Sequence, residues 1–84
     1  MEPSSADLRI LIRTKISDGR LAVDYVPRMS SGVGRGEPCL ACDRPITELQ
    51  MLMHGLLIEP ATQMLRFHVR CFYLWEEARG ALYL

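Results

Sequence analysis

Two short pairs of metal-binding residue types constrain this 84-residue chain more than any other feature. Cys39 and Cys42 form a C-x2-C pair, and His68 and Cys71 form an H-x2-C pair. Together they use every cysteine of the sequence and one of its two histidines. A tight turn can bring both thiolates of C-x2-C to one side, and on a helix the side chains at i and i+3 share a face. Each pair can therefore offer two ligands to the same ion.

The ligand types predict which ion this would be and what it would do. Three thiolates and one imidazole suit a closed, tetrahedral Zn²⁺ site that leaves no position for water or substrate. The metal would then stabilise the fold, with an apparent binding free energy of roughly 10–16 kcal/mol in comparable small modules. A chain this short buries little surface and often needs such a support. We therefore predict Zn²⁺ as the cofactor and no catalytic residues.

Three arginines flank the predicted ligands. A Zn²⁺ ion with three thiolates carries a net charge of about −1, so nearby guanidinium groups would stabilise the site. Arg44, Arg66 and Arg70 could serve in this way. The two other interpretations are a solvated basic face and a contact with an anion or phosphate.

The charge composition argues against a dedicated nucleic-acid binder. Ten basic and ten acidic residues give a formal net charge of zero, whereas nucleic-acid-binding domains usually carry a basic surface. Residues 1–36 hold only a mild excess of six basic residues over four acidic ones. Nucleic-acid binding through the basic N-terminal segment is therefore the alternative function, and its candidate contacts are Arg9, Arg13, Lys15 and Arg20.

The start of the sequence shows neither a secretory signal nor a membrane span. Its first residues are polar, and Arg9 and Arg13 interrupt the apolar stretch that follows. Three cysteines cannot pair off into disulfides, and thiolate ligands suit a reducing compartment. We expect a cytoplasmic protein that does not associate with membranes.

The N-terminal part predicts one helix and one linker. Residues 4–17 are expected to be helical because Ser4 and Asp7 match a capping box and Gly19 stands at the expected stop. A strand is the competing interpretation, since isoleucines there alternate with basic residues. Residues 21–37 are rich in Gly and Ser and have no apolar period, which predicts a flexible linker.

Residues 38–79 predict a zinc-binding unit within a single small α+β domain. A knuckle at 38–45 would precede a β-hairpin with strands near 50–58 and 64–67. A helix would follow from residue 69 and end at Gly80, with an apolar face formed by Cys71, Leu74, Trp75 and Ala78. His54 would be an ordinary strand residue.

Two apolar segments of the sequence bear on whether the protein has a surface for binding a partner. Residues 51–58 hold six large apolar side chains, more than one half-exposed strand requires. We expect the N-terminal helix to cover this strand, which would leave a monomer. The tail at 80–84 is apolar as well, so its last three residues and two helix arginines are the candidate partner contacts: Leu82, Tyr83, Leu84, Arg9 and Arg13.

The order of knuckle, hairpin and ligand-bearing helix is similar to that of a treble-clef zinc module. The ligand order also resembles the first zinc site of a LIM domain, although 25 residues between Cys42 and His68 are long for that family and no second ligand set follows. Residues 34–42 (GRGEPCLAC) and 64–79 (MLRFHVRCFYLWEEAR) resemble small, uncharacterised bacterial proteins that share C-x2-C and F-H-V-x-C-F-x-x-W-x-x-x-R. This likeness implies a bacterial source and a compact metal-binding fold, and it implies no established activity.

Three enzymatic or nucleotide-binding motifs are incomplete. Residues 38–42 match half of the zinc deaminase signature, but no histidine precedes His54 to complete it. A thioredoxin-like pair needs a strand before it and a helix after it, whereas Gly-rich sequence precedes Cys39 and Pro45 follows. The Gly-rich stretch lacks the Lys-Ser/Thr pair of a phosphate loop. We therefore predict a non-enzymatic adaptor or regulatory module that binds another protein.

Overall fold

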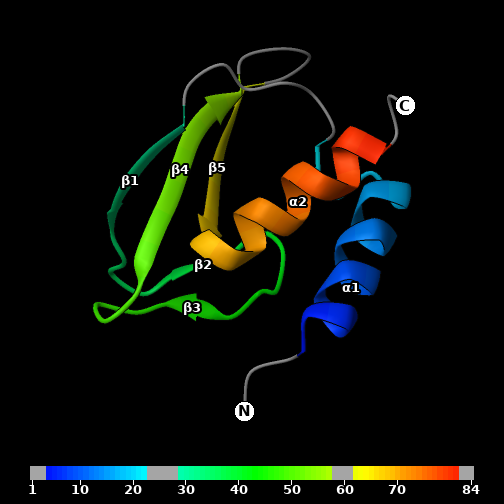
Figure 1. Ribbon diagram of the computed structural model, residues 1–84. Helices are drawn as coiled ribbons and strands as arrows, with labels where there is room; N and C mark the ends of the chain where they lie inside the picture. The colour runs from blue at the N-terminus through cyan, green and yellow to red at the C-terminus, as the bar shows by residue number, and fades with distance from the viewer. Residues whose placement is uncertain (1–3, 23–28, 58–61, 82–84) are drawn as a thin grey trace.

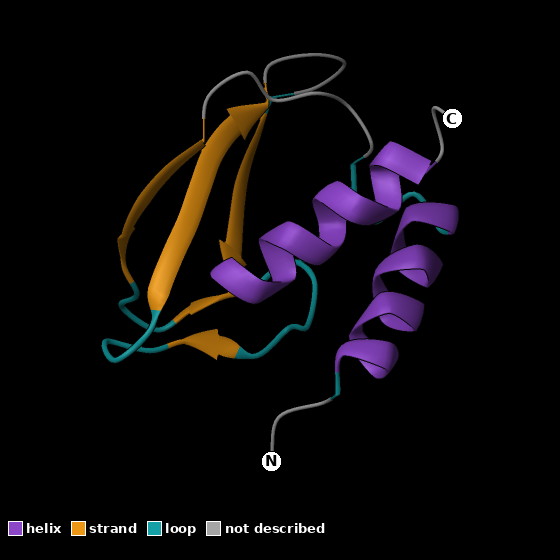
Figure 2. Cartoon of the chain, viewed as in Figure 1, coloured by secondary structure: helices purple, strands orange, loops and turns teal. Residues whose placement is uncertain are grey.

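A computed structural model of the protein describes residues 4–22, 29–57 and 62–81. The elements in chain order are α1 (Ser5–Ser17), β1 (Met29–Val33), β2 (Glu37–Pro38), β3 (Pro45–Ile46), β4 (Met51–Leu57), β5 (Gln63–His68) and α2 (Val69–Ala81). Strands β1, β4 and β5 form one sheet. Figure 1 shows α2 beside this sheet and α1 on the far side of α2. Figure 2 shows the same division between helices and strands. The predicted small α+β fold is confirmed.

Helix α1 begins and ends where its capping residues predict. The side chain of Ser4 accepts a hydrogen bond from the backbone N–H of Asp7 at 3.1 Å, so it satisfies one of the free donors of the first turn. Gly19 follows the helix with φ of +78°, a conformation in which glycine avoids the strain of a Cβ. Leu8 and Ile12 are buried. The helix, and not the competing strand, forms here.

The sheet has the strand order β1-β4-β5 and is antiparallel throughout. Strands β4 and β5 form the predicted hairpin, with register pairs from Leu52 and His68 to Leu57 and Gln63. The turn predicted at 59–62 lies largely outside the described residues. As the central strand, β4 pairs with β1 on one side and with β5 on the other. Its Leu52 and Leu57 are buried, whereas Met51 and Leu56 are exposed.

The prediction of a flexible linker at 21–37 is wrong for its second half. Residues 29–33 form β1, which pairs along β4, and Glu37–Pro38 form β2, which pairs with β3. An edge strand obtains its order from the ladder with its neighbour, and composition alone does not reveal that neighbour. Gly34 is required by close packing, because a Cβ there would lie 2.3 Å from the carbonyl oxygen of Ile46. Residues 23–28 lie outside the described part.

Helix α2 covers one face of the sheet. Trp75 is fully buried and stacks on Phe67 of β5 with ring centroids 4.9 Å apart. The predicted apolar face is buried as a whole: Cys71, Leu74, Trp75 and Ala78. Gly80 does not end the helix, which continues to Ala81. A glycine can lie within a helix at a modest cost when packing on the preceding turns holds it.

The expectation that α1 covers β4 is wrong. Helix α1 packs against α2, and α2 packs against β4 and β5. The reason is topological: α2 follows β5 directly and returns over the sheet, so it takes the face that α1 would have needed. Polar contacts between the described parts of the two helices add to this packing. Arg9 forms an ion pair with Glu77 at 2.8 Å, and Arg70 donates a hydrogen bond to Ser5 Oγ at 3.0 Å.

Candidate metal centre

The four predicted ligands lie together although they come from distant parts of the chain. Cys39 and Cys42 belong to the turn between β2 and β3, His68 is the last residue of β5, and Cys71 lies in the first turn of α2. Their ligand atoms all lie within 4.8 Å of one another. Cys39 and Cys71 are buried, and the other two are half-buried. This set could hold one metal ion.

The turn that carries the first two cysteines is shaped by the backbone. The N–H of Cys39 donates to the carbonyl of Arg44 at 2.9 Å, and the N–H of Asp43 donates back to the carbonyl of Cys39 at 2.9 Å. Asp43 has φ of +64°, in the left-handed region that Asp tolerates better than most residues. The pairing of Pro38 with Pro45 closes the loop. Both sulfurs are thereby held on one side.

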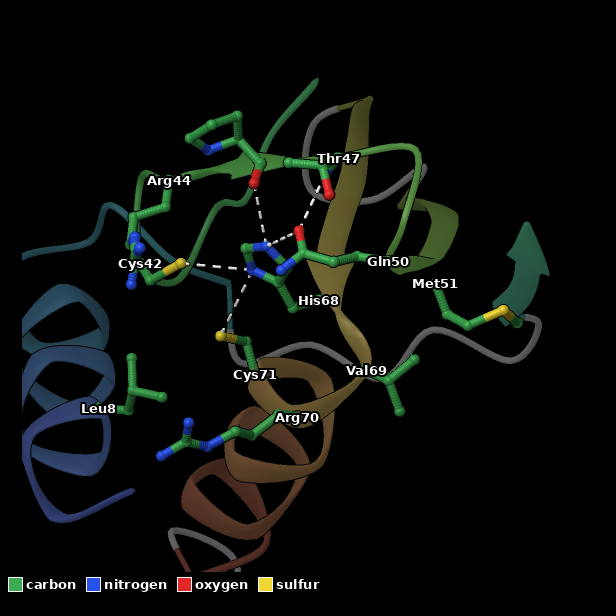
Figure 3. Close-up of a pocket in the computed structure, with 11 residues that line it drawn as sticks. Leu8, Cys42, Arg44, Thr47, Gln50, Met51, His68, Val69, Arg70 and Cys71 are labelled. Atoms are coloured by element: carbon green, nitrogen blue, oxygen red, sulfur yellow. Dashed lines mark hydrogen bonds between the residues drawn. The ribbon is translucent and has the colours of Figure 1, made fainter. Parts of the chain in front are cut away.

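The imidazole of His68 is oriented through its second nitrogen. Nδ1 lies 3.4 Å from the sulfur of Cys42 and 4.0 Å from that of Cys71. Nε2 lies 3.1 Å from the carbonyl oxygen of Pro45 and 3.1 Å from Oε1 of Gln50 (Figure 3). Two acceptors at Nε2 favour a proton there, which leaves the lone pair of Nδ1 directed at the sulfurs. Metal-binding histidines are commonly held in this way.

The spacing of the ligand atoms fits a tetrahedral ion. Zinc bonds of about 2.3 Å to sulfur and about 2.0 Å to nitrogen place these atoms about 3.6 Å apart in tetrahedral geometry. The two sulfur–nitrogen distances from His68 Nδ1, 3.4 and 4.0 Å, lie on either side of this value. These two distances are compatible with a tetrahedral metal ion, and all four ligand atoms lie within 4.8 Å of one another.

The close approach of the sulfurs perturbs their ionisation. A hydrogen bond from Cys71 lowers the pKa of Cys39. The same hydrogen bond, together with burial, raises the pKa of Cys71, and burial raises the pKa of Cys42. Deprotonation of Cys39 is thus favoured, and deprotonation of Cys42 and Cys71 is disfavoured. A divalent cation bound by the three sulfurs would stabilise all three thiolates, because its positive charge offsets the repulsion between them.

Lys15 supports the centre from α1, a role that the sequence analysis missed. Its side chain is buried, and Nζ donates to the carbonyl of Leu40 at 2.9 Å and to the Asp43 carboxylate at 2.8 Å. Both partners belong to the cysteine turn, so Lys15 ties that turn to α1. It is therefore not available for the nucleic-acid contact that the alternative function assigned to it. Its spacing from Leu8 and Ile12, at i, i+4 and i+7, was the signal that placed it on the buried face.

The other candidate residues lie apart from the cluster or outside the described part. Arg9 is paired with Glu77, whose pKa it lowers, and Arg13 is exposed on α1. His54 lies on β4 opposite Arg66, so it is indeed an ordinary strand residue. The three tail residues are not among the described ones: Leu82, Tyr83 and Leu84.

Comparison of the chain with protein-family models, with curated proteins and with solved structures gave no match. The likeness to small bacterial zinc proteins therefore rests on the quoted motif residues alone. Within residues 4–22, 29–57 and 62–81, no helix is long and apolar enough to cross a membrane.

Proposed function

We propose that this chain is a structural-zinc module in which Cys39, Cys42, His68 and Cys71 bind one Zn²⁺. The observation that carries the proposal is the convergence of four zinc-type ligand atoms within 4.8 Å, with the histidine held by Pro45 and Gln50. The ion would join the β2–β3 turn, the end of β5 and the start of α2. Because these ligands fill a tetrahedral shell, the ion has a folding role and no catalytic one.

Metal analysis tests this proposal directly. Freshly purified protein should contain about one equivalent of zinc per chain, and a strong chelator should abolish its cooperative thermal transition, because binding and folding are coupled in modules of this size. The control is the same protein after zinc is added back. A metal-free protein with three free thiols and an unchanged transition would contradict the proposal.

For the biological role, we propose a non-enzymatic adaptor or regulatory module that binds another protein in a bacterial cytoplasm. The observation that favours it is the face of the sheet opposite α2. Phe67 points to α2, so by strand alternation Met64 points the other way, and Leu56 lies next to it in register. Leu56 is 46% exposed and Met64 is 43% exposed. Neighbouring exposed apolar side chains on a sheet are a common feature of contact surfaces.

A site-specific cross-linking experiment tests this role. A photoreactive residue at Leu56, introduced in the native host, should yield one discrete protein adduct. The same group at Arg20, which is exposed and paired with Asp18, is the control and should yield none. Adducts of equal yield at both positions would contradict a role for this face, and an adduct with a second copy of the chain would indicate self-association instead.

Three ion pairs weaken the alternative of a nucleic-acid-associated regulator. Lys15 is buried against the cysteine turn, and Arg9 is neutralised by Glu77. Among the four candidate nucleic-acid contacts, Arg20 also forms an ion pair, with Asp18. The remaining positive charge on α1 is too small for strong phosphate binding.

A further inference from the structure

The two edges of the three-stranded sheet differ in how they are covered. At the β5 edge, the carbonyl of Arg66 accepts a hydrogen bond from the backbone N–H of Leu40 at 2.9 Å, so the β2–β3 turn covers this edge. At the β1 edge, no further strand of the described residues pairs with the sheet. Figure 1 shows β1 on the outer side of β4, away from both helices. Within the described part of the chain, the β1 edge is therefore open.

The register shows which backbone groups of β1 face this open edge. In an antiparallel ladder, successive residues alternate between bonding to the neighbouring strand and pointing away from it. The N–H of Gly34 donates to the carbonyl of Gln50, so every second residue before Gly34 bonds to β4 in the same way. The outward carbonyl of Arg66 agrees with this alternation, because its register partner His54 then bonds to β1. The residues that direct their N–H and C=O groups outward are Met29, Ser31 and Val33.

Strand β1 lacks the features that usually keep an edge strand from pairing. Natural edge strands commonly carry a charged side chain, a proline or a bulge. The sequence of β1 is MSSGV, which contains neither a charged residue nor a proline. Its register with β4 is unbroken from Met29 to Val33, so it has no bulge. Its central side chains are two serines and a glycine, which are small enough to let another backbone approach closely.

The outward groups of β1 are also complementary to themselves. They belong to Met29, Ser31 and Val33, which are spaced symmetrically about Ser31. If a two-fold axis passes beside Ser31, two copies of β1 pair antiparallel and each outward donor faces an acceptor. Val33, which is 59% exposed in the single chain, then lies opposite Met29 of the other copy and gains an apolar cross-strand neighbour. No charge within the strand opposes this approach.

We propose that the β1 edge is a self-association surface, through which two copies of this chain pair antiparallel and join their sheets. The second copy is the occupant because the edge is uncharged and its donors and acceptors match their own two-fold image. Contact between two five-residue strands is small beside a standard interface of about 1,600 Å², so the dimer is weak. The expectation of a monomer rested on α1 covering β4, and this premise does not hold.

Sedimentation equilibrium of the zinc-loaded, full-length protein tests the inference. Between about 10 μM and about 1 mM, the range in which a weak dimer forms, the average mass should rise from that of one chain toward that of two. The mass of one chain throughout would leave the edge to a strand of another polypeptide and would overturn the inference. A mass that rises beyond two chains would also contradict it, because two-fold pairing uses the β1 edge of both copies.

Variants of the edge locate the contact. Ser31→Pro removes an outward N–H from each copy but no hydrogen bond to β4, so the protein should stay folded and dimerise about tenfold or more weakly. Val33→Lys places a charge on the same edge and should act likewise. Ser31→Ala keeps every backbone group and is the matched control that should dimerise normally. Normal dimerisation of both edge variants would overturn the inference, as would loss of the dimer in Leu56→Ser alone, which would assign it to the face opposite α2.

Amide hydrogen exchange gives a second test that follows the alternation along β1. The N–H groups of Ser31 and Val33 should exchange quickly in the monomer and slowly at high protein concentration. Those of Ser30 and Gly32, which bond to β4, should be protected at both concentrations. An equal change at all four amides would contradict edge pairing.

Zinc is measured in every sample, which separates this inference from the proposed function. A monomer that holds one equivalent of zinc overturns the edge inference alone. A folded, zinc-free protein that still dimerises contradicts the zinc proposal alone.

Discussion

The two histidines show how strongly a role at the scale of one residue depends on its neighbours. Both belong to strands of the same sheet. His68 lies at the end of β5, where Nδ1 faces two sulfurs and Nε2 faces two oxygen acceptors. His54 lies in the middle of β4 opposite Arg66. Only the first has the partners of a metal ligand.

Replacement of these histidines should therefore have very different effects. His68→Ala removes one of four ligands, so we expect loss of bound zinc and of most of the cooperative thermal transition. His54→Ala should leave zinc content unchanged and alter the free energy of unfolding by no more than about 1 kcal/mol, as is usual outside a core. Elemental analysis and thermal denaturation measure both. Equal losses for the two variants would show that the wrong histidine was assigned.

Lys15 offers a second comparison at this scale. Lys15→Met leaves the carbonyl of Leu40 without its donor in a half-buried position, so we expect a destabilisation of about 1–3 kcal/mol. Asp43→Asn changes the exposed end of the same contact, where the Asp43 side chain is 73% accessible, and should cost less than about 1 kcal/mol. Urea denaturation distinguishes them. A larger loss for Asp43→Asn would mean that the ion pair, and not the carbonyl, carries the contact.

At the scale of elements, the β2–β3 turn depends on the segment that precedes it. Gly34 links the edge strand β1 to β2, and its N–H donates to the carbonyl of Gln50 at 3.1 Å. Its α-carbon passes so close to Ile46 and Thr47 that no side chain fits. At Gly34, the Gly-rich composition therefore reflects close packing against β3. This contact helps to position the turn that carries Cys39 and Cys42.

Substitution of two glycines by alanine separates packing from flexibility. Gly34→Ala would place a Cβ against the backbone of Ile46, so we expect a destabilisation of about 3 kcal/mol, the upper part of the range for overpacking. Gly80→Ala lies within α2 with open space around it and should stabilise by about 0.5–1 kcal/mol. Chemical denaturation measures both. A tolerated Gly34→Ala would indicate a loop that moves freely.

At the scale of the whole molecule, α2 occupies the central position. It packs on the sheet through Trp75 and on α1 through its other side, and it carries Cys71 in its first turn. Trp75 also donates a hydrogen bond to the carbonyl of Ala22, just after α1, at 2.7 Å. A metal bound at the start of α2 would thus link the sheet, the cysteine turn and both helices in one unit.

The charge distribution of the whole molecule leads to a prediction about nucleic acids. Because the net charge is zero and α1 loses Arg9 and Lys15 to internal ion pairs, we expect no micromolar binding to generic duplex DNA or RNA, even at low salt. Fluorescence anisotropy across a salt series checks this. Tight binding that weakens linearly with salt on a log–log scale would favour the regulator of nucleic acids over the adaptor.

Features that depend on local spacing could be predicted from the residues alone. The two ligand pairs, the cap at Ser4, the β4–β5 hairpin and the buried face of α2 could be read from residues a few positions apart, because turns, caps and periodic faces are local properties. The remaining features depend on long-range contacts. Strand β1, the packing of α1 on α2, the burial of Lys15 and the contact of Gln50 with His68 each need a partner far along the chain. Such contacts depend on the path of the whole backbone, which no short stretch of residues specifies.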